Sequence, residues 1–206
     1  MLSRVADNLY WMSRYLERAE HTSRLLAIKL ETLLEQTPRE AELSWRRVAA
    51  ALSGEEFVPS ADADAFEITR ALAFDPVNES SLLASLRFAR DNARQVREQI
   101  STEMWNQLNR LYLRLTPVQL ASIWNDQPGH IFRETVDELM MLEGITYSTM
   151  RHGEGWHFLE LGRYIERAQL LSRLLDLHFG RASRVVSTRD APQPIQPNAV
   201  IPGRLQ

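Results

Sequence analysis

Two stretches of the chain place glutamate and arginine side chains within one helical turn. Each has one glutamate three residues after one arginine and directly before another: Arg14, Glu17 and Arg18 in the first, and Arg163, Glu166 and Arg167 in the second. A carboxylate and a guanidinium at this spacing can form an ion pair or hold a small charged ligand. They can also transfer a proton if burial brings the pKa of the carboxyl near neutral.

The two stretches are copies of each other. Residues 14–26 align with residues 163–175 at a constant offset of 149, and nine of the 13 aligned positions are identical. Amphipathic helices share a pattern of apolar residues, but not a matched series of Tyr, Glu-Arg-Ala and Ser-Arg-Leu-Leu. The sequence therefore indicates an internal duplication.

The motif lies on an unusual helix face. Val5, Leu9, Met12 and the apolar positions that follow recur every three or four residues, which predicts one packing seam. Tyr10 and Trp11 gather with the motif charges on the opposite side. A solvated face would not carry such residues, so we expect this helix to be covered on both sides, with Glu17 at a helix–helix contact.

Two interpretations of the motif remain open. In the first, each glutamate–arginine set is structural and fixes the packing of neighbouring helices. In the second, the two sets meet around a polar pocket for a small charged ligand or a peptide end. Arg94 is a further candidate for that pocket. If the sets are structural, we expect removal of Glu17 to cost more stability than removal of Glu166, because the second helix is expected to lack later partners.

Metal sites and cofactors are not expected. Glu17, Glu20 and His21 resemble half of a metal site in a helix bundle, but the second copy has Gln169 and Leu170 at the last two positions. A second group is explained more simply by a polar helix start; it contains His152, Glu154, His157 and Glu160. The chain has no cysteine, only eight glycines and no glycine-rich phosphate loop.

Composition and charge restrict the partners. The net charge of −3 argues against a nucleic-acid binder, although Arg87, Arg90, Arg94 and Arg97 form a basic stripe that we expect to pair with acids such as Asp91 and Glu98. No apolar run is long enough for a membrane span, and charges interrupt the N-terminus too early for a secretory signal. We therefore expect a cytoplasmic protein without membrane or nucleic-acid partners.

Helical periodicity along the chain predicts an all-α fold, a multi-helix bundle of up to eight helices with an internally duplicated Glu-Arg motif helix. The first helix is predicted from about Ser3 to Glu35 and the last from Trp156 to Phe179. Caps are predicted at Asn78 and Thr116. Residues 1–180 form the predicted domain, and residues 181–206, with four of the nine prolines, form a tail predicted to be disordered.

Several motifs together resemble the bacterial Alpha-E family, an all-helical domain named for a glutamate–arginine motif. They are the opening Met1 to Met12, the two Tyr-x-Glu-Arg-Ala helices, residues 89–97 with Glu103 to Trp105, and Gly153 to Trp156. The resemblance covers residues 1–180 and implies a protein encoded beside a circularly permuted ATP-grasp ligase and a transglutaminase-like peptidase. These are the expected protein partners.

The resemblance also implies a function. We expect a non-catalytic accessory or interaction protein of an ATP-grasp-linked system that forms peptide or amide bonds. The alternatives are an enzyme of peptide or amide chemistry that uses the Glu-Arg motifs, and a bundle that binds a small anion or a metal. Family members continue with further helices after the second motif, so a truncated member is expected here.

Overall fold

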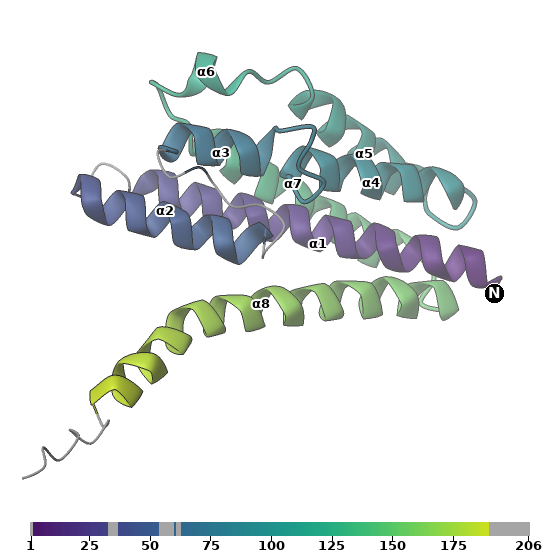
Figure 1. The fold of residues 1–206 in the computed structure, drawn as a ribbon. Helices are drawn as coiled ribbons and strands as arrows, with labels where there is room; N and C mark the ends of the chain where they lie inside the picture. Colours follow the sequence, from purple (N-terminus) through teal and green to yellow (C-terminus); the bar gives the residue numbers. More distant parts are fainter. Residues whose placement is uncertain (1, 33–36, 54–59, 61–62, 190–206) are drawn as a thin grey trace, which may run out of the picture.

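The computed structural model describes residues 2–32, 37–53, 60 and 63–189, and these residues form helices and no strand (Figure 1). The all-α prediction is confirmed. The helices are α1 (Ser3–Glu31), α2 (Pro38–Ser53), α3 (Ala65–Ala73), α4 (Leu82–Gln95), α5 (Thr102–Leu115), α6 (Leu120–Ile123), α7 (His130–Thr149) and α8 (Glu154–Arg189).

Helix α1 is the centre of the bundle. It packs mainly against α8 on one side and against α4 and α7 on another (Figure 1). Its predicted seam is buried in the core: Leu9, Met12, Ala19, Leu26 and Leu30 are each less than 10% exposed. The expectation that both sides of this helix are covered is therefore confirmed.

Side-chain caps define the starts of α2, α3, α4 and α5. Thr37 and Glu40 form a capping box at the start of α2, in which the Thr37 backbone N–H donates to the Glu40 carboxylate at 3.0 Å. Ser81, not Asn78, caps α4, because the Asn78 side chain instead accepts from the Ser80 backbone N–H. The predicted cap at Thr116 is also wrong, since its hydroxyl donates to the Tyr112 carbonyl at the end of α5.

Helix α8 is longer than predicted. It continues to Arg189 instead of ending at Phe179, because residues 180–189 contain no proline to interrupt it. The rest of the predicted tail, like residues 33–36 at the predicted end of the first helix, lies outside the described residues. No helix in the described ranges is both long and apolar enough to cross a membrane.

The two motif helices run parallel and in near register (Figure 1). They lie in close contact at Gly162 of α8, where an added Cβ would lie 2.3 Å from the Tyr10 carbonyl oxygen and 3.3 Å from the Ser13 Cβ. Ser13 is the residue aligned with Gly162 by the 149-residue offset. Small residues at equivalent positions therefore let the two helices meet backbone to backbone.

This contact predicts opposite effects for alanine at two helical glycines. Gly162→Ala should reduce the free energy of unfolding by about 1–3 kcal/mol, because the added methyl group forces α1 and α8 apart. Gly144→Ala is the matched control: a Cβ there meets nothing within 4 Å, so alanine should stabilise α7 by up to about 1 kcal/mol. Urea denaturation measures both changes, and an unaltered Gly162→Ala variant would contradict the close contact.

Candidate functional site: the paired Glu-Arg motifs and the adjoining pocket

The glutamate of the second motif is held by both arginines of the first. Glu166 is 2% exposed. Arg14 Nε donates to its Oε2 at 2.7 Å, and Arg18 Nε donates to its Oε1 at 2.7 Å. Each carboxylate oxygen therefore has its own charged donor, which is the arrangement that lets a buried carboxylate stay ionised.

The glutamate of the first motif is held in return by an arginine of the second. Glu17 is 7% exposed, and Arg167 donates to it from Nε at 2.6 Å and from Nη2 at 2.8 Å. The pairs Arg18–Glu166 and Arg167–Glu17 are equivalent under the duplication. The two motif helices are thus joined by reciprocal ion pairs, in which the glutamate of each motif binds arginine from the other. Neither glutamate binds the arginines of its own motif.

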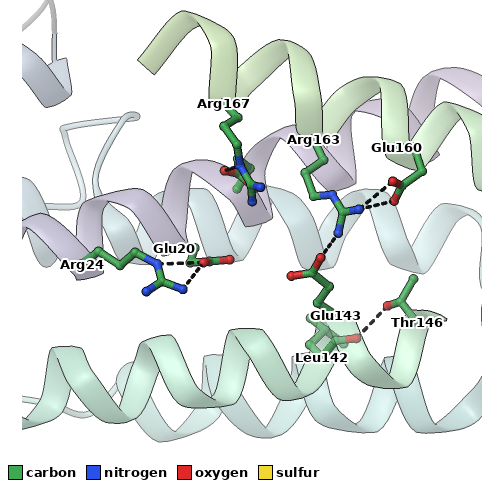
Figure 2. Close-up of polar contacts among 9 residues, drawn as sticks. Glu20, Arg24, Leu142, Glu143, Thr146, Glu160, Arg163 and Arg167 are labelled. Carbon is green, nitrogen blue, oxygen red and sulfur yellow. Dashed lines mark hydrogen bonds and ion pairs between the residues drawn. The ribbon is translucent and has the colours of Figure 1, made fainter. Parts of the chain in front are cut away.

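The remaining arginine of each motif breaks this symmetry. Arg14 donates to Glu166 and also to the Gln169 side chain, whereas its counterpart Arg163 binds Glu143 of α7 and Glu160 of α8 (Figure 2). Sequence reasoning did not identify Glu143, which is far from both motifs along the chain and carries no motif of its own. Arg163 therefore connects the motif pair to α7.

Aromatic rings position the arginines of the first motif. The Arg14 guanidinium lies 4.8 Å from the centre of the Trp11 ring and donates to the Tyr10 hydroxyl at 3.2 Å. The Arg18 guanidinium lies 5.4 Å from the centre of the Tyr15 ring. Tyr10 and Trp11, which the sequence placed on the motif face, therefore limit the side-chain conformations of the arginines there.

Burial shifts the pKa of two groups at this contact. Loss of solvation raises the pKa of Glu17 from its ordinary value, although the hydrogen bond and charge of Arg167 act in the opposite direction. Burial also lowers the pKa of His21, against the charges of Glu166 and Glu20. Within the described part of the chain, His21 Nε2 is buried and has no hydrogen-bond partner.

A pocket of about 370 Å³ lies beside the motif pair, between α1, α7 and α8. Its walls are apolar where Met12, Leu16, Leu142 and Leu159 line it. Its polar lining includes Glu17, Glu20, Glu143, Glu160 and Arg163. Each of these carboxylates is bound to an arginine, as Figure 2 shows for Glu20 with Arg24 and for Glu143 and Glu160 with Arg163.

The structure gathers most of the predicted site residues. Arg14, Glu17, Arg18, Glu166 and Arg167 form one cluster, and Arg163 lies beside it. Arg94 does not join it: this side chain is exposed on α4. The expectation from the sequence that Arg94 belongs to the pocket is wrong. Periodicity shows which residues share a face of a helix, but it does not show which other helix packs against that face.

The basic stripe and the candidate metal ligands have other surroundings. The Arg90 and Arg97 guanidinium groups lie 5.7 and 5.5 Å from the centre of the Trp105 ring, rather than on Asp91 or Glu98. His152 stacks on Trp156 with ring centres 4.0 Å apart. Among the residues that the structure describes, no group of three or more His, Asp or Glu side chains is placed to hold a metal ion.

The geometry reverses the order of stability losses expected from the sequence. Glu166→Gln should lower the free energy of unfolding by about 3 kcal/mol, because it leaves two largely buried arginines without their carboxylate. Glu17→Gln should cost about 1.5 kcal/mol, since Arg167 retains 41% side-chain exposure. Glu42→Gln, at an exposed pair within α2, is the control. Urea denaturation of the three variants tests this order, and a larger loss for Glu17→Gln would contradict it.

Burial of His21 predicts a pH dependence. The pKa of His21 in the native protein lies below the ordinary 6.5. Below pH 6.5 the imidazole therefore binds a proton more readily in the unfolded chain than in the native protein. Its contribution to the free energy of unfolding should therefore fall as the pH falls below 6.5. His21→Leu, which introduces the residue found at Leu170, should remove this loss and add about 1 kcal/mol at pH 7 by removing an unsatisfied polar group.

Denaturation curves on both sides of pH 6.5 measure the effect of His21. His130→Leu is the matched control, because it removes an imidazole from a side chain that is 56% exposed. If the wild type and His21→Leu lost stability in parallel below pH 6.5, burial of the imidazole would not be the cause.

Comparison with known proteins identifies the family. The chain is 29% identical over 191 residues to uncharacterised proteins of Mycobacterium bovis and Mycobacterium tuberculosis. These matches cover 84% of this chain but only 22% of either relative, so the chain spans about a fifth of their length. No solved structure matches the chain. The family model that matches describes a predicted α-helical domain with a conserved ER motif, and it covers residues 1–199. Its two ER motifs are Glu17-Arg18 and Glu166-Arg167, and the glutamate of each binds the arginine of the other. The chain belongs to the Alpha-E family.

Proposed function

We propose that this chain is a non-catalytic helical interaction module of the cytoplasm that serves an ATP-grasp-linked system for forming peptide or amide bonds. The observation that carries the non-catalytic part is the exchange of ion pairs between the two motifs. Glu17 and Glu166 are each bound through both carboxylate oxygens by arginines of the opposite helix. A carboxylate held in this way orders a helix contact, and it would have to leave its arginines before it could act as a general base.

The pocket between α1, α7 and α8 is the proposed place of contact with a partner or a peptide. It has apolar walls and a polar lining, which suits a peptide side chain or chain end better than a flat surface does. The pocket is built from elements that the ion pairs hold together, because Arg163 connects α8 to Glu143 of α7. The motifs would thus support the binding surface, and two of their residues, Glu17 and Arg163, would also form part of its polar lining.

The proposed partners rest on the family resemblance. The motif pattern is that of proteins encoded beside a circularly permuted ATP-grasp ligase and a transglutaminase-like peptidase. A helical module in such a group would recruit the ligase or present the peptide to it. The much greater length of the mycobacterial relatives agrees with a domain that works next to other domains.

Co-purification with the ATP-grasp ligase of the same genome tests this proposal. Gly144 lines the pocket, and a Cβ there meets nothing within 4 Å, so Gly144→Phe can fill the pocket without disturbing the helix contacts. The wild type and Gly144→Ala should retain the ligase, whereas Gly144→Phe should lose it at a melting temperature no lower than that of the wild type. A wild type that fails to retain the ligase, or a Gly144→Phe variant that retains it fully, would overturn the proposal.

One observation favours a second candidate, an enzyme of peptide or amide chemistry. Glu17 lines the pocket, and burial raises the pKa of its carboxyl, as is common for general acids and bases. The same co-purification separates the two candidates. If Glu17→Gln retained the ligase and kept its fold but stopped product formation in the reconstituted system, Glu17 would have a chemical role.

A further inference from the structure

Helix α8 carries a second apolar face that the bundle does not cover. Its residues are spaced by three or four positions, except between Ala168 and Leu175, where Ser172 stands at the intervening position. Four of them are 36–58% exposed. We call this face the outer stripe; it consists of Phe158, Leu161, Ile165, Ala168, Leu175 and Phe179. Helix α8 lies at the edge of the bundle, with α1 on its inner side (Figure 1). A surface helix normally presents polar residues on its outward face, so a largely apolar stripe there requires a reason.

The duplication supplies the reason. Every residue of the outer stripe has a counterpart in the core seam of α1 at the same offset of 149, namely Leu9, Met12, Leu16, Ala19, Leu26 and Leu30. That seam is buried under α4 and α7. The repeat therefore carries two packing faces, one with the ion pairs and one apolar. In α1 both faces are covered, whereas in α8 the described helices cover only the face with the ion pairs.

The order of residues along the outer stripe is suited to pairing with the same stripe of a second copy of the chain. In an antiparallel pair of α8 helices centred on Ala168, Leu161 lies opposite Leu175 of the second copy. In the same register Ile165 lies opposite Leu171, which is 48% exposed, and Ala168 lies opposite itself. The smallest side chain is thus at the centre, where two crossing helices come closest, and larger apolar side chains flank it on both sides.

The face is also free of charge over this length. At about 100° per residue, the sector around the outer stripe contains no Asp, Glu, Lys or Arg between Phe158 and Leu175. The other residues in that sector are Tyr164, Gln169, Leu171 and Ser172. Pairing the two faces between Leu161 and Leu175 would therefore bury mainly apolar surface without removing an ion from water. Asp176, which is exposed, lies just outside this length.

We propose that the outer stripe of α8 is the interface of a homodimer, in which two copies of this chain pair through antiparallel α8 helices about Ala168. The interface is isologous, since each contact occurs twice, related by the two-fold axis. The pocket between α1, α7 and α8 opens on the inner side of α8 and stays accessible in this dimer. The inference is independent of the proposed function, because it uses neither the pocket nor the ligase.

Sedimentation velocity of the full chain at micromolar concentrations tests the dimer. The wild type should have twice the monomer mass of 23.8 kDa, and Ala168→Glu should return it to the monomer mass, because it places two carboxylates opposite each other. Leu113→Glu is the matched control: Leu113 is 61% exposed on α5, and this variant should remain dimeric. A monomeric wild type, or a dimer that survives Ala168→Glu, would overturn the proposal.

Cysteine crosslinking tests the orientation, because the chain contains no cysteine of its own. Under mild oxidation Ala168→Cys should form a covalent dimer, since the residue faces itself. Leu161→Cys alone should not crosslink, but Leu161→Cys mixed with Leu175→Cys should. Efficient crosslinking of Leu161→Cys with itself would indicate a parallel pair, and it would overturn the antiparallel register.

Discussion

Two buried carboxylates on parallel helices, each neutralised by the opposite helix, are the constraint on which the arrangement of this bundle depends. Glu17 and Glu166 are 7% and 2% exposed. A relative shift of α1 and α8 by one residue would leave both without their arginines. Buried ion pairs add little net stability, because desolvation offsets most of the attraction, but breaking one is costly. The pairs therefore select one register, and the backbone contact at Gly162 fits only that register.

The same repeated sequence has two different environments in this fold. In α1 the apolar face is buried under α4 and α7, and α1 becomes the central helix. In α8 the equivalent face is exposed, with Leu175 and Phe179 more than half exposed. A duplicated segment keeps its ability to pack even where the bundle supplies no neighbour. This difference between the copies gives the molecule an outer face suited to association.

Arg163 of the second motif does not repeat the contacts of its counterpart Arg14, and it lines the pocket. If Arg163 followed its counterpart Arg14, it would bind Glu17 as Arg14 binds Glu166. Instead it binds Glu143 and Glu160, which connects α7 to the motif beside a pocket with apolar walls and a polar lining. The structural and functional interpretations of the motif are thus compatible. The ion pairs hold the helices, and the space beside them is available for binding.

The sequence alone determined the helical architecture, the duplication and the family, because helical periodicity and repeated residues are local properties of the chain. It also predicted that α1 is covered on both sides, since Tyr10, Trp11 and the seam residue Leu9 could not all be left in water. It did not determine that Glu17 and Glu166 exchange arginines, that Glu143 binds Arg163, or that Arg94 stays apart. Those contacts join residues far apart in the chain, and they depend on which helix lies beside which and in what register. Local patterns do not specify that choice; it is made by close packing at Gly162 and by the need to neutralise buried charge, and both exist only once the helices have assembled.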